Sequence, residues 1–264
     1  MDLQLKGKTV FISGSTSGIG FCAAKIFLQE GAIVYINGRT DTSVSKAVKH
    51  LKKQFPKGQI EGVACDFSKS EEVVVLIKKL PEINVLINNV GIYSAQSFFE
   101  TTDKDWNNQL EVNVMSGVRL SRYFLPKMLE KSWGRILFVS SECATLIPAD
   151  LISYSTTKTA VLAISRGLAQ LTKGTGVTVN SVLPGSTMTK GAEQFLSDLA
   201  KKKNKKVSQV EAEFFSEARP NSLLQRFASE EEIANTIVYF ASPIAIATNG
   251  SAIKLEGGSM GGII

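Results

Sequence analysis

The sequence predicts an α/β fold: a doubly wound, single parallel sheet of about seven strands, with helices on both faces. Short apolar runs alternate with segments of helical spacing along the whole chain, which is typical of repeated strand–helix units. The first apolar run, Val10–Ile12, is continuous, as expected for a strand that is covered on both faces. Glycines separate this run from a helical segment, at the sheet edge where such proteins bind ligands.

Size and composition favour one large domain, residues 1–264, because 44% of the residues are hydrophobic and can form a substantial core. No apolar stretch approaches the ~18 residues of a membrane span, and the N-terminus lacks the layout of a signal peptide. The three cysteines are widely spaced, which favours a reducing compartment and argues against a metal cluster. We therefore expect a cytoplasmic protein that binds neither a membrane nor a metal.

The net charge of +6 includes a local block of lysines at 201–206. Such a block can bind an acidic partner or nucleic acid. No aromatic residues interleave with it as stacking platforms, so a solvated helix face or a mobile loop is favoured and nucleic-acid binding is not expected. The single histidine, His50, lies in a polar segment and is expected to be exposed.

The first half of the chain contains four expected strands. A helix from Phe21 to Gly31 follows the first strand, because apolar residues return there at helical spacing. Asp41 is a good N-cap and Pro81 ends a helix, which fixes two element boundaries. The other elements of this half are a strand at Ala32–Asn37, a helix at Asp41–Gln54, a strand at Gln59–Cys65, a helix at Ser70–Leu80 and a strand at Ile83–Ile87.

The second half continues the alternation but is interrupted by a long polar stretch. From Gly185 to about Ser229 the pattern is irregular, and so long a connection is a candidate substrate lid. The expected elements of this half are a helical region at Asp103–Glu130, a strand at Gly134–Ser140, a helix at Ile152–Lys173, a strand at Val177–Leu183, a helix at Glu230–Ala241 and a strand at Ala252–Leu255.

The turn after the first strand has the composition of a phosphate-binding loop. Its glycines follow a Gly-x-x-x-Gly-x-Gly spacing, which permits tight turning and close approach of the backbone. The following helix N-terminus offers unpaired N–H groups and a favourable dipole to a pyrophosphate. A simple tight turn is the alternative interpretation. The predicted loop consists of Gly14, Ser15, Thr16, Ser17, Gly18, Ile19 and Gly20.

Further motifs follow this loop in a fixed order. They are Asn88-Asn89-Val90-Gly91, Ser141, Tyr154-x-x-x-Lys158 and Pro184-Gly185. Together with the glycine loop, they resemble the motifs of the short-chain dehydrogenases/reductases from about Leu5 to Gly258. The resemblance implies a Rossmann fold and an enzyme that transfers a hydride between a nicotinamide cofactor and a carbonyl or alcohol.

The residues themselves also suggest acid–base chemistry. Tyr154 and Lys158 are four positions apart and are therefore neighbours on one helix face. A nearby ammonium favours a phenolate and lowers the tyrosine pKa from ~10, which suits Tyr154 as a general acid or base. Ser141 ends the fifth strand and can donate a hydrogen bond to the same carbonyl oxygen. From the residues alone, an amphipathic pair and a strand-end cap would be the favoured interpretation.

The family resemblance favours catalysis instead. It implies that Tyr154 exchanges the proton, that Ser141 binds the carbonyl oxygen and that Lys158 also bonds the nicotinamide ribose. It adds Asn113, which in the family holds a proton-relay water behind the lysine. The resemblance further places Asp66 and Phe67 at the adenine, Asn88, Val90 and Gly91 beside the adenine ribose, and Pro184, Gly185, Thr187 and Thr189 at the carboxamide.

The end of the second strand bears on the choice of cofactor. An NAD-preferring enzyme usually carries a carboxylate there, but this chain has none before Asp41. Arg39 is suited to a 2′-phosphate, because a guanidinium binds phosphate with two parallel hydrogen bonds. Thr16 stands where many NADP-preferring members have a basic residue, and this difference weighs against a preference for NADP. NADP(H) is predicted over NAD(H), with an exposed surface arginine as the alternative.

The substrate is less well defined by the sequence. The resemblance extends to 3-oxoacyl-[acyl-carrier-protein] reductases, so a carrier-bound acyl thioester is one expected substrate. The positions of their carrier-binding basic residues are neutral here, Ser132 and Thr175, although Lys131, Lys173 or the lysine block could substitute. Glu142 follows Ser141 directly. If it faces the pocket, it disfavours anions and suits a substrate with a hydroxyl or amine; it could equally point to solvent.

Two alternatives to an acyl thioester reductase stay open. One is a reductase or dehydrogenase of a steroid, polyol or xenobiotic carbonyl. The other is a non-catalytic nucleotide-binding regulator, although such a protein has no chemical need for the complete set of four catalytic residues. The resemblance also implies a homotetramer or homodimer that packs through the long helices, where apolar positions such as Val114, Val118, Val161 and Ile164 fit an interface or an ordinary core.

Overall fold

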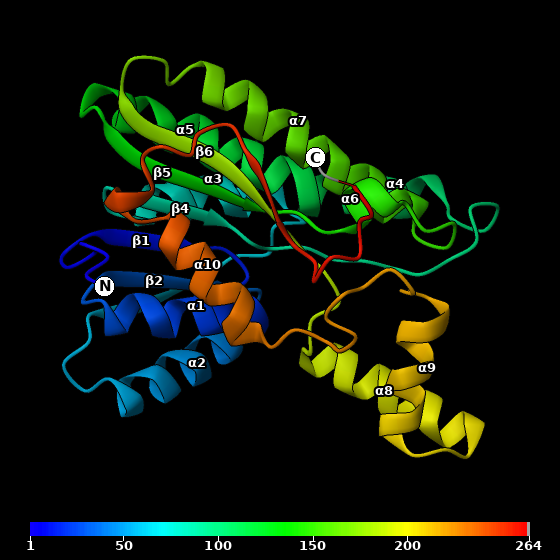
Figure 1. Cartoon of the computed structure of the whole chain (residues 1–264). Helices are drawn as coiled ribbons and strands as arrows, with labels where there is room; N and C mark the ends of the chain where they lie inside the picture. The colour runs from blue at the N-terminus through cyan, green and yellow to red at the C-terminus, as the bar shows by residue number, and fades with distance from the viewer. Residues whose placement is uncertain (263–264) are drawn as a thin grey trace.

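The computed structural model describes residues 1–262, and within them seven parallel strands form one sheet (Figure 1). The strand order is β3-β2-β1-β4-β5-β6-β7, so the chain reverses its direction of winding between β1 and β4. This is the predicted doubly wound Rossmann sheet. The strands are β1 (Thr9–Ile12), β2 (Ile33–Gly38), β3 (Ile60–Ala64), β4 (Val85–Asn88), β5 (Trp133–Val139), β6 (Gly176–Pro184) and β7 (Ala252–Leu255).

Helices cover both faces of the sheet (Figure 1). Successive residues of β1 pack into different apolar clusters: Val10 and Ile12 into one, Phe11 into the other. The strand β1 is therefore covered on both faces, as its continuous run of apolar residues predicted. The helices are α1 (Gly18–Gln29), α2 (Asp41–Gln54), α3 (Ser70–Lys79), α4 (Asp103–Leu110), α5 (Ser116–Glu130), α6 (Cys143–Leu146), α7 (Ile152–Gln170), α8 (Lys190–Lys203), α9 (Val207–Glu217) and α10 (Glu230–Phe240).

The long helical region expected at Asp103–Glu130 is continuous but not uniform. Between α4 and α5 the chain makes a π-helical turn, Glu111–Met115. Such turns occur frequently at functional sites, and this one contains Asn113. Of the apolar positions expected either at an interface or in a core, Val114 and Val161 are buried, and Val118 and Ile164 are partly buried against the same apolar cluster.

The stretch expected to be irregular, Gly185 to Ser229, contains two helices, α8 and α9, so that expectation was wrong. Thr189 caps α8, and both helices bury an apolar side together with Phe227. We call residues 187–228 the lid segment. Its two ends lie together, because Thr187 and Ala228 form a parallel bridge and the Met188 N–H donates to the Ala228 carbonyl at 2.8 Å.

The lysine block lies at the end of α8 and in the turn to α9, where all six residues are exposed. Lys203 and Lys205 both pair with Glu213 of α9, so part of the block holds the two lid helices together. This agrees with the interpretation as a solvated helix face. His50 is exposed as expected and packs edge-on against Phe21.

Candidate active site

The glycine loop between β1 and α1 is shaped by its backbone and by two asparagines. Gly14 has a φ of +61°, and a Cβ there would lie 2.8 Å from the Cα of Val90. The Gly14 N–H donates to Oδ1 of Asn37 at 3.0 Å, and its carbonyl accepts from Nδ2 of Asn89 at 2.8 Å. The loop is therefore fixed against β2 and β4, and a larger residue than glycine does not fit at its first position.

The N-terminus of α1 suits an anion. Its N-cap residue, Ser17, makes no side-chain capping bond within the described chain, so the first N–H groups of the helix are available. Gly18 has a φ of +66°, and a Cβ at Gly20 would lie 2.5 Å from Asn89. These features fit the pyrophosphate of a dinucleotide, because backbone donors and the helix dipole converge where side chains are absent.

Arg39 and Asp66 follow neighbouring strands, β2 and β3, at the same sheet edge. Arg39 is exposed, and Asp66 accepts hydrogen bonds from the Ser68 N–H at 3.0 Å and hydroxyl at 2.8 Å. Burial acts to raise the pKa of Asp66, but the bonds from Ser68 and the charges of Lys69 and Arg39 hold it below its usual value. Arg39 is thus free to meet a ligand beside a charged carboxylate.

The other predicted adenine-side residues are placed less directly. Phe67 is buried in the core, so its side chain supports the strand end rather than facing a ligand. Asn88 is buried at the end of β4, and its Nδ2 donates to Ser121 of α5 at 3.3 Å. Val90 is positioned through its N–H, which donates to the Ser13 hydroxyl at 3.0 Å.

Asn113 connects the loop after β4 to α7. Its Oδ1 accepts from the Ile92 N–H at 2.7 Å, while Nδ2 donates to the Ile92 carbonyl at 2.8 Å and to the Thr157 hydroxyl at 3.0 Å. A Cβ at Gly91 would lie 3.2 Å from Nζ of Lys158 and 3.5 Å from Oδ1 of Asn113. Asn113 and Lys158 therefore flank Gly91.

Lys158 is a buried cation with few partners. The side chain projects from α7, is 4% exposed, and donates from Nζ to the Val139 carbonyl at 2.8 Å. Burial lowers its pKa to about 8. An ammonium has three donors, so the site can bind further acceptors, which fits the hydroxyls of a cofactor ribose.

Tyr154 differs from the sequence prediction in the direction of its pKa. Burial raises the pKa of the phenol above its usual value, and the hydrogen bond with Ser141 only partly opposes this. Nζ of Lys158 lies 5.6 Å from the centroid of the tyrosine ring. In the protein alone, desolvation therefore outweighs the ammonium. The expected lowering was wrong, because burial favours the neutral phenol of Tyr154.

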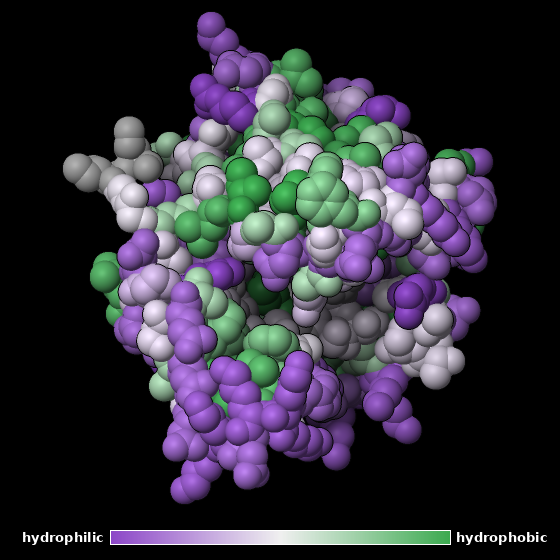
Figure 2. All heavy atoms as spheres, turned by 90° about the vertical axis from the view of Figure 1, so that its right-hand side faces the viewer, coloured by the Kyte–Doolittle hydropathy of each residue, from purple (hydrophilic) through white to green (hydrophobic). Residues whose placement is uncertain are grey.

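Two of the predicted catalytic residues, Ser141 and Tyr154, and the predicted carboxamide-binding residues border one cavity of about 800 Å³, which Asn113 and Lys158 do not line. The cavity is bounded on one side by the lid segment, and Tyr93 packs edge-on against Tyr154 with ring centroids 5.9 Å apart. Figure 2 shows this face hollowed between the polar surface below, where α8 and α9 lie, and the more apolar surface above. Of the predicted residues, the cavity is lined by Ile19, Ser141, Tyr154, Pro184, Gly185, Thr187 and Thr189.

The chain matches the family model for short chain dehydrogenases over residues 8–200. It belongs to that family. The oxidoreductase YvrD of Bacillus subtilis is 48% identical over 261 residues, covering 98% of both chains. The 3-oxoacyl-[acyl-carrier-protein] reductase of Aquifex aeolicus is 28% identical over 98% of this chain and 99% of its own. Among solved structures, L-sorbose reductase from Gluconobacter frateurii, complexed with NADPH and L-sorbose, superposes over all of both chains with a TM-score of 0.93 and 29% identity.

This short-chain dehydrogenase is an NAD(P)-dependent oxidoreductase. Its seven-stranded sheet, described over residues 1–262, is the one shared with the solved relative. Across the same residues, no group of three or more histidine, cysteine or acidic side chains is arranged to hold a metal. No helix in that range is long and apolar enough to cross a bilayer.

Glu142 is the site residue whose environment the sequence left most open. It is 3% exposed and therefore does not point to solvent. Its Oε1 accepts from Nε of Arg219, which follows α9, at 2.7 Å. Sequence reasoning missed Arg219, which lies 77 positions away in a stretch without a motif. Tyr93, which packs against Tyr154, and Asn37, which accepts from the Gly14 N–H, were also missed.

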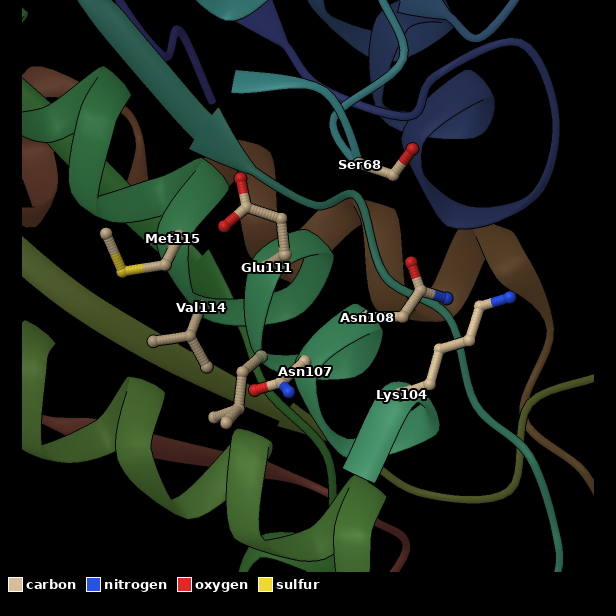
Figure 3. Close-up of a pocket in the computed structure, with 8 residues that line it drawn as sticks. Ser68, Lys104, Asn107, Asn108, Glu111, Val114 and Met115 are labelled. Carbon is tan, nitrogen blue, oxygen red and sulfur yellow. The ribbon is translucent and has the colours of Figure 1, made fainter. Parts of the chain in front are cut away.

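A second cavity, of about 870 Å³, lies apart from these residues (Figure 3). It runs along α4 and the π-helical turn, and side chains such as Asn107, Asn108 and Glu111 border it. Glu111 is paired with Arg119 of α5. The cavity is large but offers no acid–base group beyond this ion pair and Lys104, so we assign no chemistry to it.

Proposed function

We propose that the protein reversibly transfers a hydride between NADP(H) and the carbonyl or secondary alcohol of a small molecule. The observation that carries the proposal is the common cavity, in which Ser141 and Tyr154 lie within hydrogen-bonding reach of each other and Lys158 lies behind the tyrosine. A bound nicotinamide would supply the hydride. The protein has to supply the proton, the charge stabilisation and the exclusion of water.

The residues divide this work as their environments suggest. Tyr154, kept neutral by burial, gives its proton to the carbonyl oxygen while Ser141 donates a hydrogen bond to the same oxygen. The ammonium of Lys158 stabilises the phenolate that remains and binds the ribose hydroxyls. Asn113 holds the loop at Ile92 against α7, and in this proposal also anchors the water that returns the proton.

Arg39 supports NADP(H) over NAD(H). Its exposed guanidinium follows β2, the strand whose end contacts the adenosine ribose in Rossmann proteins. The proteins that superpose with NADPH or NADP in their structures are consistent with this. A charge-assisted contact of this kind contributes about 1.5–3 kcal/mol.

Two substrate classes deserve direct comparison. A 3-oxoacyl thioester is supported by full-length relatives that are 3-oxoacyl-[acyl-carrier-protein] reductases. A sugar or polyol is supported by the full-length superposition with L-sorbose reductase. Ser132 and Thr175 lack the charge with which a basic residue would bind an acidic carrier, which favours the second class.

The test is substitution of the proposed proton donor, Tyr154→Phe. We expect near-complete loss of NADPH oxidation with carbonyl substrates, while the Kd for NADPH changes by less than about threefold, because the ring is kept and only the acidic proton is removed. Tyr123→Phe, on the exposed side of α5, is the matched control. Unchanged turnover in Tyr154→Phe would refute the mechanism. If the wild-type protein binds NADPH but turns over no carbonyl or alcohol, the alternative of a non-catalytic nucleotide-binding regulator is favoured.

A further inference from the structure

Glu142 is a buried carboxylate at the edge of the proposed active site. It directly follows Ser141 and is fixed by its own N–H, which donates to the Pro184 carbonyl at 2.8 Å. This bond ties the turn after β5 to the end of β6. The side chain is thereby held beside the reacting groups by backbone structure, and not by a flexible loop.

The two oxygens of this carboxylate have different surroundings. Oε1 accepts from Nε of Arg219 at 2.7 Å and from the Ser186 hydroxyl at 3.4 Å. Oε2 is also buried, but no group in residues 1–262 donates a hydrogen bond to it. A Cβ at position 185 would lie 3.0 Å from Oε2 and 2.6 Å from the Cα of Glu256, so only a glycine lets the end of β6 pack this closely beside the carboxylate.

A buried carboxylate oxygen without a donor is unfavourable, and native proteins satisfy nearly all such atoms. The Arg219 guanidinium neutralises the charge from one side but does not satisfy the second oxygen. Glu142 lines the same cavity as Ser141 and Tyr154. A donor that enters the cavity with the substrate is therefore the natural partner for Oε2.

We propose that Oε2 of Glu142 accepts a hydrogen bond from a substrate hydroxyl close to the reacting carbonyl. This inference rests on the proposed function and specifies its substrate class: neutral hydroxylated ketones such as ketoses, and in reverse the matching polyols. Glu142 is then a specificity-determining residue. Arg219 is a positioning residue, since it orients the carboxylate and joins it to the lid segment.

The same geometry disfavours the competing substrates. A plain ketone or a 3-oxoacyl thioester brings no hydroxyl beside the carbonyl, so Oε2 stays unpaired when it binds. Sites built to hydrogen-bond a hydroxyl discriminate strongly against analogues that lack it, because the buried partner is left unsatisfied. A carboxylate or phosphate on the substrate would also meet the negative charge of Glu142.

The experiment compares kcat/KM for a ketohexose, 2-hexanone and an acetoacetyl thioester with NADPH. We expect the wild type to prefer the ketohexose at least tenfold. Glu142→Gln should lower kcat/KM for the ketohexose about ten- to a hundredfold, because an amide is a weaker acceptor and disturbs the contact with Arg219. The same variant should change kcat/KM for 2-hexanone less than threefold and leave the Kd for NADPH unchanged.

Two controls separate substrate recognition from structure. Asp150→Asn removes an exposed carboxylate at the rim of the same cavity and should leave the ratio of the two kcat/KM values unchanged. Arg219→Met removes the group that orients Glu142 and should therefore lower kcat/KM for the ketohexose more than for 2-hexanone. If Glu142→Gln does not fold, wild-type kcat/KM across a series of deoxy-ketoses gives the same information without any variant.

Several outcomes would overturn this proposal without touching the proposed function. They are a wild-type preference for 2-hexanone or the thioester, or an equal loss of both ketone activities in Glu142→Gln. Absence of turnover with every carbonyl and alcohol, with either cofactor, would instead overturn the proposed function, and this inference with it.

Discussion

Lys158 illustrates at the scale of one residue how a functional group opposes stability. Its pKa of about 8 lies below the usual 10.5, so between these values the folded protein binds fewer protons than the unfolded chain. The free energy of unfolding therefore rises with pH across that window, and the full cost of burying the charge is present below pH 8. The buried ammonium is kept for its chemistry.

Lys158→Met should accordingly be inactive but more stable than the wild type at pH 7, by about 2 kcal/mol after the lost hydrogen bond to Val139 is subtracted. Urea unfolding at pH 7, 9 and 10.5 measures this. The stability difference between variant and wild type should shrink as pH rises from 8 to 10.5. A difference that stays constant with pH would mean that the pKa of Lys158 is the same in the folded and unfolded states.

The pKa shifts of Tyr154 and Lys158 set the expected pH dependence of carbonyl reduction. Burial keeps Tyr154 protonated through neutral pH, whereas Lys158 loses its charge near pH 8. We expect kcat/KM for carbonyl reduction to be flat below about pH 8 and to fall above it. Initial rates of NADPH oxidation from pH 6 to 10 test this. A fall that begins below pH 7 would contradict the assignment.

Arg39 gives a prediction about cofactor choice. Arg39→Leu should raise the Kd for NADPH about ten- to a hundredfold, because it removes one charge-assisted contact to the 2′-phosphate. The Kd for NADH should stay within about twofold. Arg122→Leu, which removes another exposed arginine, is the matched control in fluorescence titrations. Equal weakening of both cofactors would contradict a contact to the 2′-phosphate.

At the scale of single residues, much of the site could be predicted from the sequence, because several of its residues are related by short, regular spacings along the chain. The pair Tyr154 and Lys158 is separated by one helical turn, and in the structure Tyr154 lies beside Ser141 while Nζ of Lys158 lies 5.6 Å from the centroid of the tyrosine ring. The ion pair between Glu142 and Arg219 depends on how the lid segment returns to the sheet, and no local pattern encodes it. The pKa direction of Tyr154 also requires burial, which spacing does not reveal.

At the scale of elements, the turn between β1 and α1 requires a glycine at position 14. Gly14→Ala would place a methyl group 2.8 Å from the Val90 backbone at a φ of +61°. We expect the loop to shift and the Kd for both NADPH and NADH to rise at least tenfold. Gly167→Ala, at a helical position where a Cβ meets no atom within 4 Å, is the matched control. Normal cofactor binding by Gly14→Ala would show that the loop tolerates the shift.

Elements with strong periodicity were predicted well, and those with mixed composition were not. β4, β5 and α2 lie within a few residues of their expected ranges. α8 and α9 were missed because lysines and acidic residues fill their exposed faces, leaving only a few buried apolar positions, such as Leu196 and Val210. Their apolar side packs mainly within the lid segment, so it is shorter than the stripe of a helix that covers a sheet.

At the scale of the whole molecule, cofactor binding should stabilise the fold, because the site joins strands on both sides of the β1–β4 junction. NADPH at a hundred times its Kd contributes about 2.7 kcal/mol, which corresponds to a rise in Tm of about 5–10 °C for a chain of this size. Thermal unfolding with NADPH and NADH at equal concentrations measures this. The smaller shift should belong to NADH, and an equal shift would argue against a preference.

The parallel sheet of this molecule was predictable from alternation alone, since strand–helix units wind in one direction. The predicted assembly into a homotetramer or homodimer stays a prediction. The cavity itself was not predictable as a shape, because one side belongs to the lid segment and the other to turns after β5 and β6. Only the three-dimensional return of the chain brings these together.

The closed base of the lid segment makes it a separable module for engineering. Because Ser186 and Met188 exchange backbone hydrogen bonds with Ala228, the roughly forty residues between them leave and rejoin the sheet at one point. Relatives of different selectivity could therefore be recombined at these two positions without altering any strand. A grafted segment with its own cation at the position of Arg219 would keep Glu142 paired. A grafted segment without such a cation would leave the buried carboxylate of Glu142 unpaired.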